Sequence, residues 1–447
     1  MKLRNFLAKK NYQLKRYPVH SGENGEKKMD LYIYQLDKDI KIAYLSVAKC
    51  ASNEIRNILK TLTGDQKRLE INVNNKNDSR LENLIIFSFI RNPWERFHSA
   101  FNMIFGKTSL EAPIDFLNFS KFPDGCNKAD PGHWSPQYDQ LITEKGEILP
   151  EYIGDINSLY SGIDNIIKES VSDEKVKDDL RVRLRNIQNQ SKKQHVKNKD
   201  FTDTSFYIKY YNTKTYENVK EYLKTDIELF NYSFGLHQAT LTNLSLFYGL
   251  DKNKAVSHNY MPNYEEVLGH KKNEVKALLE IGVGGVYDLS HTLAGGDPQR
   301  NFYKSGNSLR MWRDYFINAN VYGMDIREDL MFTEDRIKTF IANQHDENDL
   351  RRVITEIKSK LDVIIDDGSH DPNDQVFSFI NLRKYLALKG VYIIEDIPAP
   401  YIEKFKDLSI FPPEARSDIE NNFQVKYFDT REGFASDDFM MVLKRIS

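Results

Sequence analysis

The sequence predicts two α/β domains in series, the second built around a parallel, doubly wound sheet. The chain has 447 residues, which is too long for one ordinary hydrophobic core. In both halves, short apolar stretches alternate with amphipathic stretches, as strands alternate with helices in α/β proteins. Several apolar stretches of the second half also end in glycine or in acidic residues, as strands do beside a ligand crevice. We expect the domains to cover residues 1–236 and 237–447.

The composition excludes several classes of protein. The 63 basic residues nearly balance the 65 acidic ones, which argues against a nucleic-acid or membrane-surface binder. The two cysteines, Cys50 and Cys126, exclude a disulfide framework and argue against a cysteine zinc site. The stretch "MKLRNFLAKKNYQLKRYP" lacks the apolar core of a signal peptide, and no run of 18 apolar residues follows it. We therefore expect a cytoplasmic protein with neither a nucleic-acid nor a membrane partner.

In the first half, two segments repeat the order strand, loop, helix. The first is "IKIAYLSVAKCASNEIRNILK" (40–60), and the second is "LENLIIFSFIRNPWERFHSAF" (81–101), whose strand runs to Phe89 or Ile90. The charged segment 165–200 predicts a solvated helix and loop. Apolar spacing predicts one helix over 214–236.

Both loops of these segments are candidate phosphate sites. A short loop between a strand and a helix leaves free backbone N–H groups at the helix start, and these bind anions. Lys49 lies in the first loop and Ser52 at the start of its helix. Arg91 follows the second strand, and Ser99, two helical turns on, could reach the same phosphate. The simpler alternative is a capped helix with a surface lysine and an ion pair between Arg91 and Glu95.

In the second half, four apolar stretches predict strands, and a fifth closes the chain. They are "KALLEIGVGG", "NANVYGMDI", "LDVIIDD", "GVYIIEDI" and the last, "FMMVLKRI". Helical stretches such as "SLRMWRDYF" and "NDQVFSFINLRKYL" lie between them. This alternation predicts the parallel sheet.

The first two of these strands end in residues suited to a nucleotide cofactor. Glu280 ends one strand and is followed by Gly282, where glycine lets the backbone pass close to a ligand. Asp325 ends the next strand, where an acidic side chain can bind ribose hydroxyls. The spacing between the two acids exceeds the roughly 20 residues of dinucleotide folds. An NAD-dependent oxidoreductase is the competing interpretation of this pattern.

The next two strands end in paired carboxylates. Asp366 and Asp367 follow one strand, and Glu395 and Asp396 follow the other. Four carboxylates at one edge repel each other unless a cation is bound, and oxygen ligands suit Mg²⁺. His370 lies in the turn after the first pair and could take a proton from a metal-acidified hydroxyl. In the structural alternative, the acids cap helices and His370 only packs.

The N-terminal motifs resemble a known family. "KCASN" and "RNPWERFHSAF" resemble the two nucleotide-binding segments of sulfotransferases, which use 3′-phosphoadenosine 5′-phosphosulfate. The segments "GHWSPQYDQL", "EYIGDINSL" and "FNYSF" resemble later landmarks of the chondroitin-type carbohydrate sulfotransferases. The resemblance covers about residues 35–235, and Ala48 stands where the family has proline.

The resemblance implies a P-loop-like sulfotransferase domain with a parallel sheet. Lys49 and Ser52 would hold the 5′-phosphosulfate, and Arg91 and Ser99 the 3′-phosphate. Lys49 would also stabilise the leaving phosphate. The base that takes the acceptor proton would be His133 or Glu54.

The C-terminal motifs resemble a second family, the class I S-adenosylmethionine-dependent O-methyltransferases. The likeness is closest to the metal-dependent sugar type that methylates macrocin and mycinamicin, and it covers about residues 240–447. It implies a Rossmann-like domain, often part of a homo-oligomer. It implies contacts to S-adenosylmethionine from Glu280, Gly282, Asp325 and Asp366. It also implies a Mg²⁺ ion held by Asp367, Glu395 and Asp396, with His370 as the general base.

Together these observations favour a bifunctional transferase. One half would sulfate and the other would methylate hydroxyl groups, on a sugar of a glycan or a glycosylated metabolite. The alternative is a magnesium-dependent sugar O-methyltransferase whose N-terminal half is a non-catalytic binding module.

Overall fold

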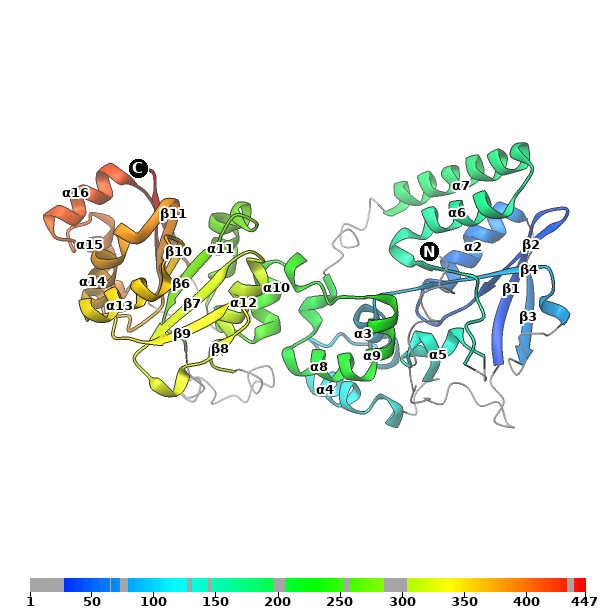
Figure 1. Cartoon of the computed structure of the whole chain (residues 1–447), viewed down its shortest axis with the longest axis horizontal. Coiled ribbons are helices and arrows are strands. Elements are labelled where there is room, and N and C mark those ends of the chain that lie inside the picture. The colour runs from blue at the N-terminus through cyan, green and yellow to red at the C-terminus, as the bar shows by residue number, and fades with distance from the viewer. Residues whose placement is uncertain are drawn as a thin grey trace. The chain divides into compact units, whose positions relative to one another are not determined.

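The computed structural model describes residues 28–64, 66–72, 79–126, 131–143, 146–195, 206–252, 258–284, 304–431 and 438–447. The chain divides into two compact units (Figure 1). The first comprises residues 1–210 and 214–234, and the second comprises residues 211–213 and 235–447. Within the described ranges, no helix is both long and apolar enough to span a bilayer. The assignment of one activity to each unit stays a prediction.

The described part of the first unit contains a five-stranded sheet with the order β3-β1-β2-β4-β5. Its strands are β1 (Lys28–Asp37), β2 (Ile40–Leu45), β3 (Lys67–Asn72), β4 (Leu84–Ile90) and β5 (Tyr152–Asp155). β2, β4 and β5 run parallel, whereas β1 is antiparallel to both β2 and β3. The sheet is therefore mixed, and the parallel pairing expected of a P-loop-like domain is confined to β2, β4 and β5.

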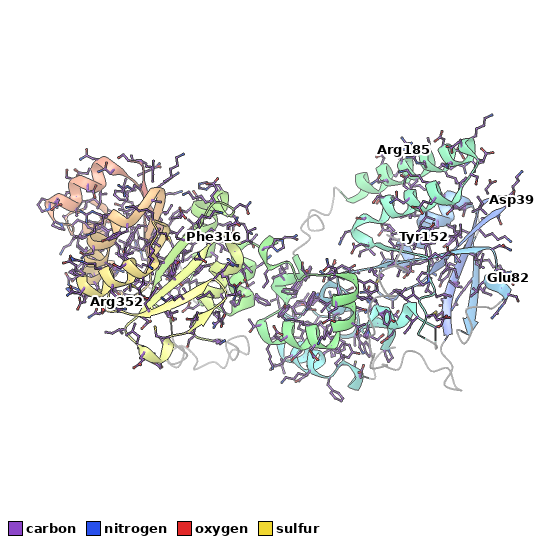
Figure 2. The ribbon with its side chains drawn as sticks, viewed as in Figure 1. Asp39, Glu82, Tyr152, Arg185, Phe316 and Arg352 are labelled. Carbon is purple, nitrogen blue, oxygen red and sulfur yellow. The ribbon has the colours of Figure 1, made fainter. Side chains whose placement is uncertain are left out.

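Helices follow β2 and β4 as the sequence predicts. The helices of this unit are α2 (Ser52–Thr63), α3 (Pro93–Phe105), α4 (Pro113–Lys121), α5 (Gln137–Leu141), α6 (Leu159–Ser170), α7 (Glu174–His195), α8 (Thr213–Tyr222) and α9 (Lys224–Phe230). Asn92 caps α3, because its side chain accepts hydrogen bonds from the backbone N–H groups of Trp94 and Glu95. The charged α7 exposes side chains such as Arg185 to solvent (Figure 2).

The single helix expected over 214–236 is wrong, since α8 and α9 are separate helices. α9 ends at Phe230, and the next residue, Asn231, has a left-handed φ of 54°. Asp226, near the start of α9, is fully buried. Its carboxylate accepts hydrogen bonds from the backbone N–H groups of Gln137 and Tyr138, at 2.7 and 2.8 Å.

The described part of the second unit contains an eight-stranded sheet with the order β12-β13-β11-β10-β6-β7-β9-β8. Its strands are β6 (Ala277–Ile281), β7 (Asn320–Asp325), β8 (Thr333–Glu334), β9 (Ile337–Ile341), β10 (Leu361–Asp366), β11 (Leu386–Ile394), β12 (Phe423–Asp429) and β13 (Phe439–Arg445). β11, β10, β6, β7 and β9 run parallel, and β13 is antiparallel to β11. β9 was not expected, because the exposed Lys338 interrupts its apolar residues.

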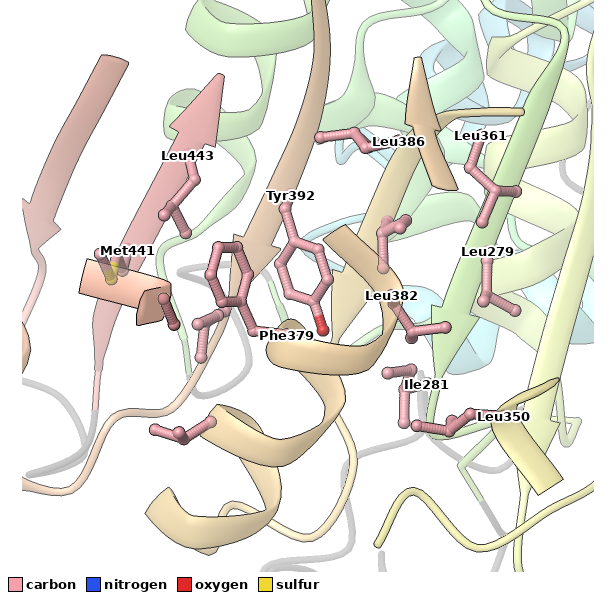
Figure 3. Packing of buried hydrophobic residues seen from close by; sticks show 14 of the residues in the cluster. Leu279, Ile281, Leu350, Leu361, Phe379, Leu382, Leu386, Tyr392, Met441 and Leu443 are labelled. Carbon is pink, nitrogen blue, oxygen red and sulfur yellow. The ribbon is translucent and has the colours of Figure 1, made fainter. Parts of the chain in front are cut away.

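Helices cover both faces of this sheet, as expected of a doubly wound fold (Figure 1). They are α10 (Leu241–Tyr248), α11 (Met261–Leu268), α12 (Asn307–Tyr315), α13 (Glu347–Ile357), α14 (Pro372–Leu382), α15 (Ile402–Lys406) and α16 (Pro413–Asn422). On one face, Ile281 and Tyr392 pack with Phe379 of α14 in a buried cluster that α13, α15 and α16 complete (Figure 3). On the other face, α12 packs so closely on β7 that a Cβ at Gly323 would lie 2.6 Å from Leu309.

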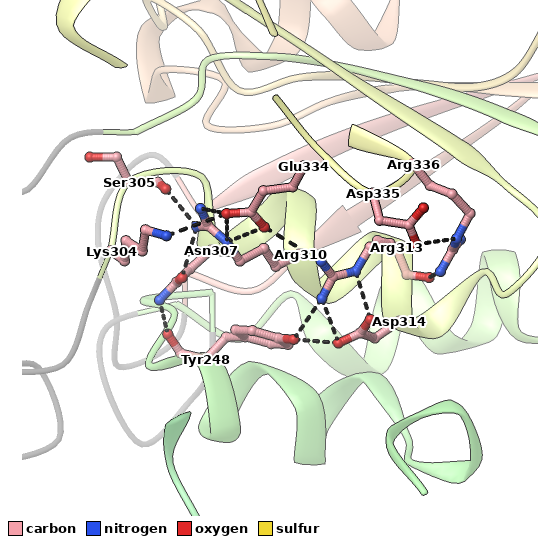
Figure 4. Close-up of polar contacts among 10 residues, drawn as sticks. All are labelled: Tyr248, Lys304, Ser305, Asn307, Arg310, Arg313, Asp314, Glu334, Asp335 and Arg336. Carbon is pink, nitrogen blue, oxygen red and sulfur yellow. Dashed lines mark hydrogen bonds and ion pairs between the residues drawn. The ribbon is translucent and has the colours of Figure 1, made fainter. Parts of the chain in front are cut away.

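An ionic network holds α12 in place (Figure 4). Arg310 of α12 pairs with Glu334 of β8 at 2.7 Å. Arg313 pairs with Asp314 at 2.8 Å, and Asp314 accepts a hydrogen bond from the Tyr248 hydroxyl of α10. The Arg310–Glu334 pair and the Tyr248–Asp314 hydrogen bond orient α12, because each joins it to another element and involves buried or half-buried side chains.

Candidate functional site

The carboxyl ends of β6, β7, β10 and β11 lie at one edge of the second sheet. Asp366 is in register with Ile281 of β6 and with Ile394 of β11, so the residues that follow these strands are neighbours. The backbone N–H groups of Asp367 and Glu395 continue the pairing with the carbonyls of Ile281 and Asp366, both at 3.0 Å. The predicted gathering of acidic residues at this edge therefore follows from parallel pairing.

Asp366 and Asp367 point to opposite faces, because successive side chains of a strand alternate. Asp366 is fully buried toward α14, where it accepts hydrogen bonds from Ser378 and, at 3.2 Å, from Gln344. Burial raises the pKa of Asp366 to about 6. Asp367 faces the other way and accepts a hydrogen bond from the ammonium of Lys252 at 2.6 Å. The two adjacent carboxylates thus belong to different environments.

Glu395 and Asp396 are both buried on the Asp367 side. Glu395 accepts hydrogen bonds from Lys252, at 2.5 Å, and from the Tyr264 hydroxyl. Asp396 accepts one from the Tyr260 hydroxyl at 2.5 Å. Burial, reinforced by the charge of Asp367, raises the pKa of both carboxyls. These groups are costly as anions unless positive charge is supplied.

His370 lies between two of these carboxylates. Its Nε2 is 3.4 Å from Asp367 and 3.4 Å from Asp396. Its backbone has a left-handed φ of 59°, so the turn after β10 aims the ring back toward the strand ends. Burial alone would lower the pKa of His370, but the hydrogen bond and charge of Asp367, with the charges of Asp396 and Glu395, raise it to about 9.

Asp367, His370 and Asp396 form a candidate metal site. Each offers a ligand atom, and these atoms lie within 4.8 Å of one another. The two carboxylates offer the oxygen ligands that Mg²⁺ prefers and so fit the predicted magnesium, whereas imidazole suits softer cations, which leaves His370 for its predicted role as the base. Glu395 lies beside this group and engages Lys252, and its role as a ligand stays a prediction. His258, Asp396 and Asp438 form a second such group, in which His258 and Asp438 are already paired.

The residues expected to contact a nucleotide cofactor lie at the ends of β6 and β7. Glu280 accepts hydrogen bonds from Ser308, at 2.8 Å, and Trp312, at 3.3 Å, and burial raises its pKa to about 7. Gly282 has a φ of 92°, and a Cβ there would lie 2.0 Å from the Asp367 carbonyl, so only glycine lets these two loops meet. Asp325 accepts a hydrogen bond from the Val283 backbone at 2.9 Å. The cofactor roles of these residues and of Asp366 stay predictions.

The first unit brings its two predicted loops together. Arg91 donates a hydrogen bond to the carbonyl of Lys49 at 3.3 Å and pairs with Glu95 at 2.6 Å. Its Nε is buried and has no hydrogen-bond partner among the described residues. Burial and the charges of Arg91 and Arg96 lower the pKa of Lys49. Cations that disfavour each other in this way make an attractive site for an anion.

The remaining predicted residues of this unit lie around the same loops. Ser52 begins α2, where its hydroxyl donates to the Val47 carbonyl at 2.9 Å and receives a hydrogen bond from Ser46 at 3.0 Å. Ser99 is half-buried in α3, and His133 is half-buried at the end of a short 3₁₀ turn. The roles of Ser99, Ser52 and His133 stay predictions.

Sequence reasoning missed the residues that hold the two loops in place. Gln137 accepts a hydrogen bond from the Arg91 N–H and donates one to the Arg91 carbonyl, both at 2.8 Å. Gln140 accepts one from the Ala48 N–H at 3.1 Å and donates one to the Gly132 carbonyl at 2.9 Å. The segment "GHWSPQYDQL", which contains both glutamines, was noted only for its resemblance to sulfotransferases. Nothing in its residue spacing predicts these contacts.

Arg96 also holds these loops in place, and the sequence patterns did not single it out. It is fully buried and donates hydrogen bonds to the carbonyls of Ala48, at 2.8 Å, and of Ser135 and Gly132, each at 2.6 Å. Arg96 thus ties the loop that carries Lys49 to the segment that carries His133.

Comparison with known proteins supports both resemblances. Residues 33–233 match the model of the sulfotransferase family. A relative from Streptomyces olivaceus, 8-demethyl-8-alpha-L-rhamnosyl tetracenomycin-C 2'-O-methyltransferase, is 36% identical over 166 residues, 37% of this chain and 40% of that protein. Demethylmacrocin O-methyltransferase from Streptomyces fradiae is 33% identical over 147 residues, 32% of this chain and 33% of that protein.

A solved structure is also similar. A methyltransferase from the mycinamycin biosynthetic pathway, in complex with Mg and SAH, is 24% identical, with a TM-score of 0.38, over 53% of this chain and 64% of that chain. The matched segments span 40% and 38% of the first two curated relatives, so less than two thirds of their length is represented. The expected resemblance to a sulfotransferase in the first half and to sugar O-methyltransferases in the second is confirmed.

Proposed function

We propose that this protein is a two-activity transferase that sulfates and O-methylates hydroxyl groups of a sugar, on a glycan or a glycosylated small molecule. The observation that carries the proposal is that one chain holds two sites of opposite charge. Acidic strand ends surround an imidazole in the second unit, and two cationic loops meet in the first. Each site has the charge that its donor or cofactor would need.

In the methyl-transfer half, His370 is the base that takes the proton of the acceptor hydroxyl. A divalent cation held by Asp367 and Asp396 would acidify that hydroxyl and, by neutralising the carboxylates, lower the pKa of His370. Tyr260 orients Asp396 through its hydroxyl hydrogen bond. S-adenosylmethionine is the donor that the relatives support, and Glu280 and Asp325 would bind it from the ends of β6 and β7.

In the sulfuryl-transfer half, Lys49 stabilises charge on the leaving phosphate of 3′-phosphoadenosine 5′-phosphosulfate. Arg91 and Ser99 would bind the 3′-phosphate, and Ser52 the 5′-phosphosulfate. The acceptor proton would pass to His133. Location in the cytoplasm and homo-oligomerisation through the second unit stay predictions.

The test supplies the purified full chain with both donors, one carrying labelled sulfate and the other a labelled methyl group, and with a rhamnosylated small molecule as acceptor. Transfer of both labels is expected, and omission of either donor should remove only its own label. Transfer of the methyl label alone would reject the two-activity proposal.

One observation favours a second candidate function, a sugar O-methyltransferase with a non-catalytic sulfotransferase-like module. The Arg91 guanidinium is already paired with Glu95 at 2.6 Å, as the simpler sequence interpretation expected. A phosphate would have to displace this partner. Turnover of the sulfate donor separates the two candidates, because a binding module retains the nucleotide without consuming the donor.

A further inference from the structure

Lys252 supplies a positive charge at the acidic edge of the second sheet. It follows α10 in the sequence and is 4% exposed. Its ammonium donates hydrogen bonds to Asp367 at 2.6 Å and to Glu395 at 2.5 Å. A buried lysine is rare unless it is paired, and here it is paired twice.

Asp367 is shared between this lysine and the candidate metal site. One oxygen, Oδ2, accepts the hydrogen bond from Lys252, and the other, Oδ1, faces Nε2 of His370 at 3.4 Å. Glu395, the other partner of Lys252, lies outside the group of Asp367, His370 and Asp396. The lysine therefore holds two of the three carboxylates that the family resemblance implies as metal ligands.

We propose that Lys252 is a built-in counter-cation that competes with a divalent cation for Asp367 and Glu395. This inference rests on the proposed metal-dependent methyl transfer and concerns the affinity of that same site. In the cation-free protein, the ammonium neutralises carboxylates that would otherwise repel each other. When a divalent cation binds, the ammonium shares Asp367 with it or gives up that carboxylate.

Either outcome weakens cation binding. Two positive charges that contact one carboxylate repel each other, and the repulsion is strong where water is excluded. The site would consequently release its cation more readily than a site built from the same carboxylates without the lysine.

The test measures Mg²⁺ binding by calorimetry to the chelator-treated full chain, without donor or acceptor. Lys252→Met should bind Mg²⁺ roughly tenfold or more tightly than the wild type, since a repelling charge is removed. Lys252→Arg keeps the charge and should resemble the wild type. Lys271→Met is the matched control, because Lys271 is also a buried lysine of the second unit, bonded instead to the carbonyl of Lys389.

A second readout is thermal stability. Chelated Lys252→Met should unfold at a lower temperature than the chelated wild type, and Mg²⁺ should raise its unfolding temperature more. If Lys252→Met does not fold, Glu395→Gln is compared with the double variant K252M/E395Q, and the double variant should bind Mg²⁺ more tightly.

Unchanged or weaker Mg²⁺ binding in the lysine-free variants would overturn this inference and leave the proposed metal site standing. Failure of every variant and of the wild type to bind Mg²⁺ would overturn the inference together with the metal role in the proposed function. Because the calorimetry uses no sulfate donor, its result does not depend on whether the first unit transfers sulfate.

Discussion

The acidic edge of the second sheet and the basic loops of the first unit are electrostatic opposites. In the second unit, burial and neighbouring carboxylates raise the pKa of Glu395 and Asp396. In the first, burial and neighbouring cations lower the pKa of Lys49 and Arg96, although Cys50 and Asp226 partly oppose the shift at Arg96. Each site concentrates one sign of charge, so each attracts a ligand of the other sign.

The two sites differ in how the protein stabilises them without a ligand. The acidic edge has a full counter-charge, Lys252, placed directly on two carboxylates. The basic loops use both kinds of partner, since Arg96 binds three backbone carbonyls whereas Arg91 pairs with the Glu95 carboxylate at 2.6 Å. A charged partner competes with a ligand, whereas neutral partners leave the net charge in place. We therefore expect the loop that Arg96 holds to rearrange little on ligand binding, whereas Arg91 would have to leave Glu95 just as Asp367 would have to share or leave Lys252.

The largest expected effect separates the two units. His370→Ala should lower methyl transfer by about 10²–10⁴-fold, because the acceptor proton loses its base, and should leave sulfate transfer unchanged. The measurement is labelled methyl transfer at saturating donor. His345→Ala is the control, since His345 is half-exposed and pairs with Asp374, which is not one of the clustered carboxylates. Equal loss of methyl and sulfate transfer would indicate a folding defect and would contradict the assignment of His370 to methyl transfer alone.

The converse change tests the basic loops. Lys49→Ala should lower sulfate transfer by about 10²–10³-fold through loss of charge stabilisation at the leaving phosphate, with methyl transfer retained. The label released from the sulfate donor is the readout. Lys41→Ala serves as the control, because Lys41 is an exposed residue of the preceding strand, β2. Full sulfate transfer by Lys49→Ala would contradict the role given to this loop.

We expect the first unit to lose stability as the pH falls, because of one buried histidine. Burial, then the charges of Arg91 and Lys209, lowers the pKa of His98 from 6.5 to about 4, and its ring is stacked on Tyr210. As the pH falls from 6.5 to 4, His98 becomes protonated in the unfolded chain, whereas its ring stays neutral in the folded protein. The free energy of unfolding should therefore fall by an amount on the order of 3 kcal/mol.

His98→Phe keeps an aromatic ring at this position and removes the titrating group. Unfolding temperatures measured between pH 4 and pH 7 should therefore fall less steeply with acid in the variant than in the wild type. Identical pH profiles would show that His98 is not the acid-sensitive group.

The smallest expected effect concerns the preorganisation of the basic loops. Gln137→Leu leaves the N–H and carbonyl of Arg91 without their partner, which should cost about 1–3 kcal/mol of unfolding free energy. Binding of adenosine 3′,5′-bisphosphate should weaken in parallel. Calorimetry and denaturant unfolding provide the two measurements, with Gln35→Leu, an exposed residue of β1, as the control. Weakened stability with unchanged nucleotide affinity would separate the glutamine from the donor site.

Sequence patterns predicted the elements whose periodicity is strong. β2 with α2, β4 with α3, and the strands β6, β7, β10, β11 and β13 lie where apolar stretches indicated them. β1, β3 and β9 were missed, although the alternation of apolar and polar residues in β1 and β3 is itself typical of a half-buried strand. β5, β8 and β12 were not predicted either. The single helix expected over 214–236 was wrong, because the helix is interrupted at Leu223 and α9 ends before the left-handed Asn231.

By itself, the sequence determined which residues end the parallel strands, because strand length and apolar composition are local properties. It therefore placed Asp367, His370 and Asp396 in one region. Only the tertiary structure decided that Asp366 faces α14 while Asp367 faces Lys252, and that Gln137 holds the loop of Arg91. Those contacts join segments distant in the chain, and their energies depend on burial and on mutual distance, which no local pattern encodes.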